Sequence, residues 1–237
     1  MPTLYIVATP IGNLKDITLR ALHVLEEVDL ILCEDTRKTK KLLEHYNIKT
    51  PIESYHQHSK LKKIEQILDL LRQGKNLALV SDSGTPGISD PGNKLIQSLI
   101  TDYQLPVTII PIPGVSAITA AASISGIPMD KFVFLGFPPH KKGRNKFFKE
   151  VAEYKYPVVI YESPHRILKT LGDLRRTYTE QSGTNTEPPI VVGKELTKKF
   201  EKIYRGTISE AIKMIEKDGV RGEYVIIINN KRRTDAE

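Results

Sequence analysis

Apolar runs alternate with amphipathic stretches along the first half of the chain. Four continuous apolar segments predict buried strands, at residues 4–9, 30–33, 77–81 and 107–111. Between them, apolar residues recur at helical spacing over residues 21–28 and 61–71. We expect Asp16 to cap the first helix, Ser59 to cap the second and Gly74 to end it. Continuous apolar strands between amphipathic helices are typical of a parallel sheet covered on both faces.

The pattern changes near residue 112, where proline and glycine interrupt the chain and a small-residue helix follows at 117–125. Later strands are predicted at residues 132–137, 158–161, 190–192 and 224–228. Helices are predicted at 146–153, 165–177 and 209–217, and a polar loop at 181–189. The sequence therefore predicts two α/β domains, residues 1–113 and 114–237, with the boundary between residues 112 and 118.

Composition and charge narrow the function classes. The 35 Lys and Arg against 28 Asp and Glu give a net charge of +7, which favours polyanionic partners and also suits plain solubility. The one cysteine, Cys33, excludes an intramolecular disulfide and fits a reducing compartment. No apolar run approaches the roughly 20 residues of a membrane helix. We expect a cytoplasmic protein without a membrane segment.

Three glycine- and proline-containing loops follow three of the predicted strands. They are Ser81-Asp82-Ser83-Gly84-Thr85-Pro86-Gly87, Thr9-Pro10-Ile11-Gly12-Asn13-Leu14 and Pro113-Gly114-Val115-Ser116-Ala117. Each could be an ordinary turn. Ligands of open parallel sheets bind beyond the carboxyl ends of the strands, so three such loops predict one rim around one ligand.

Other binding motifs are missing from the sequence. There is no G-x-G-x-x-G, no G-x-x-x-x-G-K-[ST] and no C-x-x-C, which argues against the usual dinucleotide site, a P-loop and a zinc ribbon. His56 and His58 could face one way and bind a metal, but no third ligand is evident, so a surface or substrate-facing loop is favoured. We expect no metal.

Six segments in order carry a specific resemblance. They are Pro10–Leu14, Glu34–Arg37, Ser81–Gly87, Pro113–Ala117, Tyr161–Arg166 and Gly193–Lys198. Together they span nearly the whole chain. This series resembles the bacterial small-subunit (16S) rRNA (cytidine-2′-O)-methyltransferases of the tetrapyrrole methylase superfamily. The Asp82–Pro86 and Pro113-Gly114 loops resemble the superfamily as a whole. The three charged segments, Glu34–Arg37, Tyr161–Arg166 and Gly193–Lys198, resemble its rRNA branch.

The resemblance implies a class III methyltransferase that uses S-adenosylmethionine (SAM). It implies two α/β domains, a largely parallel sheet in the first and a mixed sheet in the second, with SAM between them, and a homodimer. The implied reaction methylates the 2′-hydroxyl of a decoding-centre cytidine, in small-subunit rRNA or the assembled subunit. The implied SAM residues are Pro10, Gly12, Asp82, Ser83, Gly84, Thr85, Pro86, Ser116 and Ala117, with Tyr161 from the second domain.

Methyl transfer to a ribose hydroxyl is an in-line displacement, which needs alignment and help with loss of the hydroxyl proton. Glu162 and Glu195 are candidate proton acceptors, and Arg166 and Lys194 are candidates to stabilise the developing charge. With equal weight, the same four residues could be structural ion pairs.

Basic stretches provide candidate RNA contacts, because such side chains bind phosphates without reading sequence. Most basic stretches in proteins are simply solvated. The stretch at residues 138–146 (PPHKKGRNK) is the one we favour. The candidate RNA-binding residues are Arg37, Lys38, Lys141, Lys142, Arg144 and Lys146.

Two other functions are compatible with this fold, because fold alone does not fix function. The first is methylation of a tetrapyrrole or other small acidic molecule, which predicts a deep apolar cleft and little salt dependence. The second is a non-catalytic RNA-binding protein that holds SAM and releases no S-adenosylhomocysteine. The rRNA-branch segments weigh against the first, and the intact Asp82–Gly87 loop weighs against the second.

Overall fold

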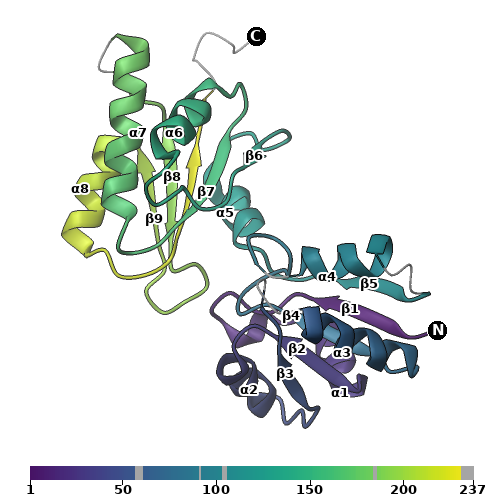
Figure 1. The fold of residues 1–237 in the computed structure, drawn as a ribbon. Coiled ribbons are helices and arrows are strands. Elements are labelled where there is room, and N and C mark those ends of the chain that lie inside the picture. Colours follow the sequence, from purple (N-terminus) through teal and green to yellow (C-terminus); the bar gives the residue numbers. More distant parts are fainter. Residues whose placement is uncertain (57–60, 91, 103–105, 184–185, 231–237) are drawn as a thin grey trace. The chain divides into compact units, whose positions relative to one another are not determined.

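The computed structural model describes residues 1–56, 61–90, 92–102, 106–183 and 186–230. The chain forms two compact units, Met1–Ser116 and Ala117–Glu237 (Figure 1). The division falls within the interval 112–118 at which the sequence pattern changes. Each unit has its own sheet and its own hydrophobic core.

The sheet of the first unit is parallel throughout, with strand order β3-β2-β4-β1-β5. Its strands are β1 (Thr3–Val7), β2 (Leu30–Cys33), β3 (Ile52–Ser54), β4 (Leu77–Val80) and β5 (Thr108–Ile112). Every residue of the central strand β4 is buried, because both faces of the sheet are covered. The predicted parallel sheet of the first domain is confirmed.

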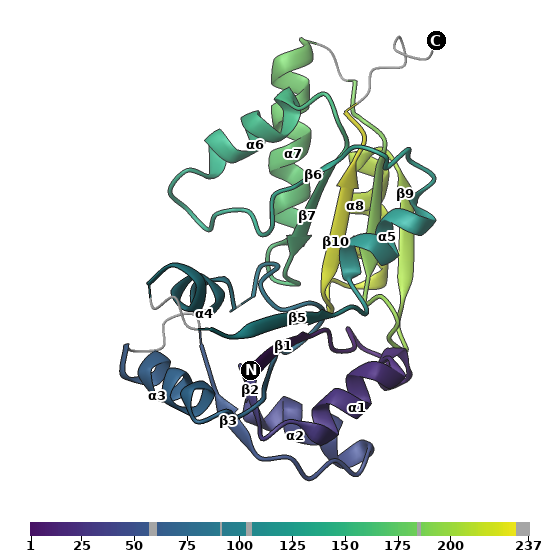
Figure 2. The ribbon, with the colours of Figure 1, turned by 90° about the vertical axis from the view of Figure 1, so that its right-hand side faces the viewer.

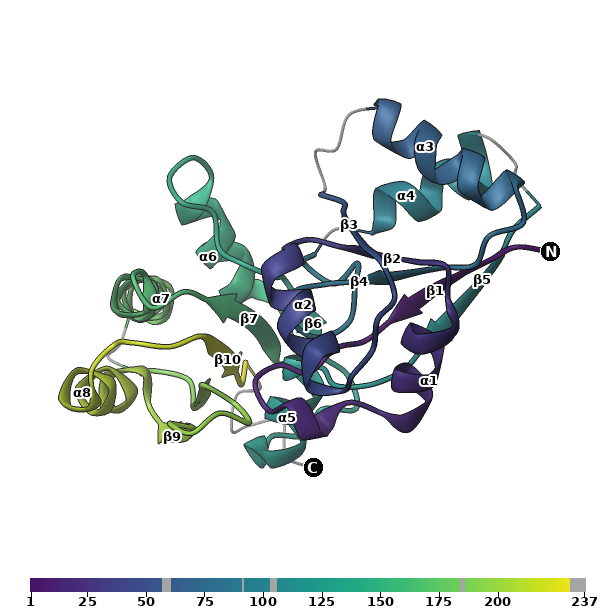
Figure 3. The same cartoon turned by 90° about the horizontal axis from the view of Figure 1, so that it is seen from below.

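Helices cover both faces of this sheet. They are α1 (Leu19–Glu27), α2 (Thr36–His45), α3 (Leu61–Arg72) and α4 (Asn93–Gln97), with a 3-10 turn at Leu14–Asp16 and a π-helical turn at Ser98–Asp102. Figure 3 shows α3 and α4 on one side of the sheet and α1 and α2 on the other. Alternate residues of β4 enter the two cores: Leu77 and Leu79 pack with α3 and α4, and Ala78 and Val80 pack with α1.

The start of α1 differs from the prediction. Asp16 ends the 3-10 turn, and Thr18 caps α1 by accepting a hydrogen bond from the amide of Ala21 at 3.1 Å. Threonine is a good cap because its hydroxyl satisfies an amide that the helix leaves unpaired. The prediction that Asp16 caps this helix was therefore wrong. Gly74 follows α3 in the left-handed conformation, as predicted, whereas Ser59 lies outside the described residues.

Strand β5 forms one edge of the sheet and contains a proline at its fourth position, Pro111. The amide of Thr108 donates to the carbonyl of Pro2, toward the neighbouring strand β1. Since amides alternate in direction along a strand, the nitrogen of Pro111 lies on the outer side of the edge, where no ladder hydrogen bond is lost.

The second unit contains a mixed sheet with strand order β6-β7-β10-β8-β9. Its strands are β6 (Val133–Phe134), β7 (Val158–Glu162), β8 (Ile190–Lys194), β9 (Lys202–Gly206) and β10 (Tyr224–Ile228). The β6–β7 pair is parallel and the other three pairs are antiparallel. The expected mixed sheet is confirmed.

Four helices accompany this sheet: α5 (Ala117–Ser125), α6 (Arg144–Glu153), α7 (Ile167–Ser182) and α8 (Ile208–Asp218). The apolar sides of α6, α7 and α8 form one core with the strands, including Phe148, Leu171 and Ile215. Figure 2 shows α5 on the opposite face of the sheet from α8. Among the described residues, no helix is both long enough and apolar enough to span a bilayer.

Candidate functional site

The carboxyl ends of the first unit's strands gather the loops that the sequence singled out. Because β1, β2, β4 and β5 run parallel, the segments that follow them leave the sheet at the same edge. These segments begin at Ala8, Glu34, Ser81 and Pro113. The sheet topology therefore places the three predicted loops and the acidic start of α2 along one edge.

Hydrogen bonds join the three glycine- and proline-containing loops into one structure. Thr9 and Gly84 form a two-way backbone bridge, with N···O distances of 2.9 and 3.0 Å. The Thr9 hydroxyl also donates to the carbonyl of Ser81 at 3.1 Å. The Thr85 hydroxyl donates to the carbonyl of Val115 at 3.4 Å. We call this joined set of loops, residues 8–14, 81–87 and 113–116, the rim.

Two glycines make the rim possible. Gly84 has φ of +81°, in the region that side chains disfavour, and its neighbours Ile11 and Val115 come from the other two loops. Gly114 lies directly against Ala8, where an added Cβ would come within 2.9 Å of the Ala8 Cβ. The absence of a side chain at these two positions thus lets the three loops pack directly against one another.

Asp82 fixes the start of α2. Its carboxylate accepts a hydrogen bond from the backbone amide of Asp35 at 2.9 Å and forms an ion pair with Lys38 at 2.7 Å. Asp35 in turn caps α2 and pairs with Arg37 at 2.7 Å. Hydrogen bonds from the Arg37 side chain and amide hold the pKa of Asp35 below its usual value. These charges form one network across the ends of β2 and β4.

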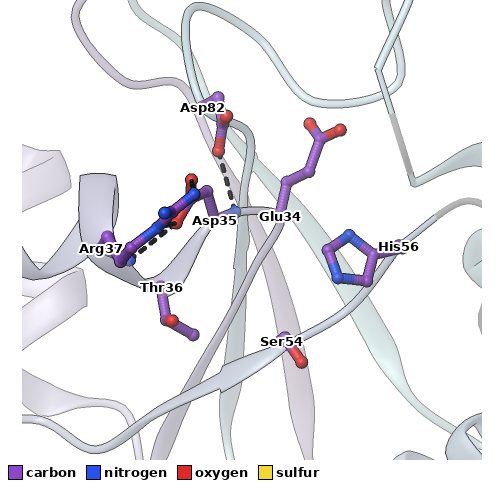
Figure 4. Close-up of a pocket in the computed structure, with 7 residues that line it drawn as sticks. All are labelled: Glu34, Asp35, Thr36, Arg37, Ser54, His56 and Asp82. Carbon is purple, nitrogen blue, oxygen red and sulfur yellow. Dashed lines mark hydrogen bonds and ion pairs between the residues drawn. The ribbon is translucent and has the colours of Figure 1, made fainter.

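A pocket of about 420 Å³ opens beside this network (Figure 4). Its lining is polar and charged, and comprises Glu34, Asp35, Thr36, Arg37, Ser54, His56 and Asp82. In Figure 4 the ring of His56 and the side chain of Glu34 lie on one side of the pocket view, and Arg37 lies on the other. The sequence pattern singled out Asp82 and Arg37 as site residues. It left out Ser54, because the short strand β3 was not predicted.

Two carboxyl groups near this edge, those of Glu34 and Asp90, are harder to ionise than usual. Burial raises the pKa of Glu34, and the charge of Asp82 raises it further. Burial, reinforced by Glu34, raises the pKa of Asp90 to about 6. Glu34 directly follows a predicted strand and belongs to the segment Glu34–Arg37 that the sequence had already singled out. Asp90 could not, because the path of the chain after Gly87 has no regular pattern.

The residues that the resemblance assigns to SAM lie in two groups. Pro10, Gly12, Asp82, Ser83, Gly84, Thr85, Pro86 and Ser116 belong to the rim of the first unit. Ala117 and Tyr161 belong to the second unit, where the Tyr161 ring packs against Phe134 and Phe137 at centroid distances of 4.9 and 5.4 Å. Asp82 alone of these ten lines the described pocket.

The candidate catalytic residues Glu162 and Arg166 pair with each other. The Glu162 carboxylate is fully buried, and it lies 2.7 Å from the Arg166 guanidinium and 2.7 Å from the amide of Ser163. Its second oxygen accepts from the Thr170 hydroxyl at 2.5 Å. Ion pairing between these side chains, which the sequence left open against a catalytic role, is present.

Lys194 and Glu195 lie at the same end of the sheet as Glu162, because Glu162 and Lys194 both pair with Tyr224 of β10, but they have other partners. The Lys194 ammonium is buried and donates to the carbonyl of Gly219 at 2.5 Å. Burial alone would raise the pKa of Glu195, but the Glu223 amide and Lys198 outweigh it and hold the pKa below its usual value. A base for neutral-pH catalysis works best with a pKa near 7, so this environment does not favour Glu195 as the base. A catalytic role for the four residues stays a prediction.

The candidate RNA-binding residues differ in exposure. Lys141, Lys142 and Lys146 are exposed, and the side chain of Arg37 is 87% exposed. Arg144 is instead buried, and its guanidinium is bonded within the second unit. Its geometry does not suit direct contact with phosphate.

Metal binding has no support in the described residues. Within them, no group of three or more His, Cys, Asp or Glu side chains is placed to hold a metal ion. His56 lines the pocket, and His58 lies outside the described part of the chain.

Comparisons with known proteins agree with the resemblance. Residues 3–212 match the model of the tetrapyrrole (corrin/porphyrin) methylases. The ribosomal RNA small subunit methyltransferase I of Synechocystis sp. is 44% identical over 229 residues, covering 96% of this chain and 79% of that protein. The protein of the same name from Thermotoga maritima is 42% identical over 231 residues, covering 98% of this chain and 100% of that protein.

Solved structures support the fold. Cobalt precorrin-4 methyltransferase aligns with a TM-score of 0.68 at 20% identity, over 96% of this chain and 94% of that one. Uroporphyrin-III-C-methyltransferase from Thermus thermophilus aligns with a TM-score of 0.66 at 18% identity, over 97% and 95% of the two chains. The chain therefore belongs to the tetrapyrrole (corrin/porphyrin) methylase family and, within it, to the family of the ribosomal RNA small subunit methyltransferases I.

Proposed function

We propose that the protein transfers a methyl group from SAM to the 2′-hydroxyl of a cytidine in the decoding centre of small-subunit rRNA. The observation that supports this most directly is the rim, in which Thr9, Gly84 and Val115 are brought together at the carboxyl edge of a parallel sheet. The relatives named as rRNA methyltransferases over nearly the whole chain supply the substrate class.

The rim fits SAM in its chemistry. Gly84 and Gly114 let the three loops approach one another closely, and this gathers the polar groups of the rim at the strand ends, where such groups can bind a nucleoside or an amino-acid moiety. The adjacent carboxylates of Asp82 and Glu34 suit hydroxyl groups and a positively charged ligand. When bound, SAM supplies an activated methyl group, and the residues of the chain have to orient it toward the incoming hydroxyl.

The exposed cations fit a nucleic-acid substrate. Arg37 and Lys38 lie at the start of α2, and Lys141, Lys142 and Lys146 lie on the segment between β6 and α6 and on α6 itself. We propose that these five side chains contact phosphates, which predicts binding that weakens with salt. The assembled subunit or its naked rRNA is the proposed partner, and the cytoplasm is the proposed compartment. We propose a homodimer, on the strength of the family resemblance.

The deciding experiment incubates the purified protein with labelled SAM and either naked small-subunit rRNA or isolated small subunits. Nuclease digestion followed by nucleoside mass analysis then locates the label. We expect 2′-O-methylcytidine. Tight SAM binding without RNA labelling would contradict the proposal and favour methylation of a tetrapyrrole or other small acidic molecule. SAM and RNA binding without any S-adenosylhomocysteine would indicate a non-catalytic protein.

A further inference from the structure

Residues 138–143, here called the basic loop, form the second part of the connection between β6 and α6 in the second unit. His140, Lys141 and Lys142 are exposed on it, whereas Pro138 is buried. Two guanidinium groups, of the partly buried Arg166 and the buried Arg144, hold its backbone from inside: Arg166 donates to the carbonyl of Pro138 at 2.8 Å, and Arg144 donates to the carbonyl of Pro139 at 3.0 Å. The loop thus presents cations outward while arginines fix its inner side.

The two arginines are themselves fixed by one connected set of groups. Arg166 pairs with Glu162 at 2.7 Å, and Arg144 pairs with Asp173 at 2.8 Å. The hydroxyl of Thr170 joins the two pairs, because it accepts from Arg144 at 2.7 Å and donates to Glu162 at 2.5 Å. Thr170 is fully buried and lies on α7, so the set is anchored to a 16-residue helix.

Stability alone is a weak reason for such an arrangement. Burying charges has a desolvation penalty, and replacing a buried ion pair with well-packed apolar side chains is often neutral or stabilising. A network of this kind does determine geometry, since guanidinium hydrogen bonds act only over a narrow range of directions. What this network fixes, besides α7, is the backbone at the start of the basic loop.

We propose that Arg144, Thr170 and Arg166 are positioning residues that hold the basic loop ready to present Lys141 and Lys142 to the RNA backbone. The inference rests on the proposed rRNA methylation. It gives Arg144 an indirect role in RNA binding. A loop ordered before binding loses less conformational entropy on association, so the network strengthens binding without touching RNA.

The first test measures how readily the basic loop opens in the full-length protein, and it needs no RNA. Thr170→Val removes the hydroxyl that joins the two arginine pairs, and Thr170→Ser retains it as the matched control. Trypsin cleaves after lysine, so mass spectrometry of the fragments reports opening at Lys141 and Lys142. We expect cleavage there to be about 10-fold faster in Thr170→Val, because both hydrogen bonds of the buried hydroxyl are lost and the loop opens more often, and unchanged in Thr170→Ser. Equal rates in wild type and Thr170→Val overturn the proposal.

A second variant distinguishes local opening of the basic loop from unfolding of the whole protein. Arg166→Lys keeps the charge but not the forked geometry that reaches both Glu162 and Pro138. Cleavage at Lys141 and Lys142 should accelerate in this variant too, while cleavage after Lys213 in α8 stays at the wild-type rate. Acceleration at all three sites together would show general unfolding and would overturn a local role.

The second test measures affinity for isolated small subunits as a function of salt. Lys141→Ala with Lys142→Ala should lower the salt slope by about 2. Thr170→Val should lower it as well, although the variant removes no exposed charge. It should also raise KM for the subunit more than it lowers kcat, and Thr170→Ser should restore both values.

Combining the variants separates indirect from independent effects. If the network acts through the two lysines, Thr170→Val adds little further loss of affinity once both lysines are alanine. Fully additive losses overturn the proposal. If Lys141→Ala with Lys142→Ala leaves the affinity for the subunit unchanged, the proposal is overturned as well, even where the trypsin test shows that the network holds the basic loop closed. Failure of the proposed function has a separate signature, because the wild-type protein would then leave the subunit unmethylated.

Discussion

At the residue scale, neighbours in the sequence can have opposite environments in the structure. Lys142 is exposed and Arg144, two residues later, is buried under the basic loop. The stretch PPHKKGRNK could be recognised as basic from the sequence alone. The sequence alone could not show which of these cations faces inward. The partners of Arg144, Thr170 and Asp173, lie on α7, more than 25 positions away in the chain.

The glycine of the rim gives a prediction with a control in the same unit. Gly84→Ala and Gly74→Ala both place a side chain at positive φ, +81° and +85°. Each should lower the free energy of unfolding by about 1 kcal/mol in urea denaturation. Calorimetry should show SAM affinity about tenfold weaker in Gly84→Ala only, which corresponds to ~1.4 kcal/mol. Equal SAM affinities in the two variants would remove Gly84 from the proposed site.

Asp90 gives a prediction of pH dependence. Its pKa is raised from 3.8 to about 6 by burial and then by Glu34 and Asp82, against lowering by Ser81 and Lys38. The folded protein therefore retains a proton that the unfolded chain has lost between these pH values, so wild-type stability falls as pH rises through this window.

Asp90→Asn removes the ionisable group and should not show this fall. Relative to wild type, the variant should gain about 1 kcal/mol in free energy of unfolding between pH 4 and pH 7, a figure that allows for solvent screening. Denaturation at the two pH values measures the difference. A constant difference between variant and wild type would contradict the raised pKa.

At the element scale, hydrophobic patterning located the elements that bury most. The small-residue helix predicted at 117–125 is α5, with the same bounds, and the apolar runs at 30–33 and 224–228 are β2 and β10. Patterning missed α2, whose TRKTKKLLEH sequence is mostly charged, and the edge strands β3 and β9. These elements bury few side chains, so apolar periodicity could not reveal them.

The capping of α1 tests the corrected boundary. Thr18→Ala should lower the free energy of unfolding by about 1 kcal/mol, because the Ala21 amide loses its acceptor. Asp16→Ala is the comparison, since Asp16 ends the preceding turn and one of its carboxylate oxygens is buried without a hydrogen bond. Urea denaturation should show the loss in Thr18→Ala alone. A larger loss in Asp16→Ala would favour the original assignment of the cap.

At the scale of the whole molecule, each unit encloses its own core. The core of the second unit draws only on residues between Val133 and Ile228. We therefore expect the fragment Ala117–Glu237 to unfold cooperatively on heating, measured by circular dichroism. Ile226→Ala in the fragment should lower its stability by about 3 kcal/mol, because Ile226 is fully buried in the central strand. A fragment with no cooperative transition would show that the second unit requires the first.

The proline at the edge of the first sheet has a consequence for solubility. An exposed strand edge can pair with the edge of another molecule and start aggregation, and proteins commonly block such edges with proline. Pro111 has no outward N–H to offer a second chain. Pro111→Val would keep an apolar side chain and add that donor, so light scattering should show self-association at lower protein concentration. By removing an outward N–H from the edge of β5, the ring of Pro111 thus acts against fibrous or amorphous assembly of the protein at high concentration.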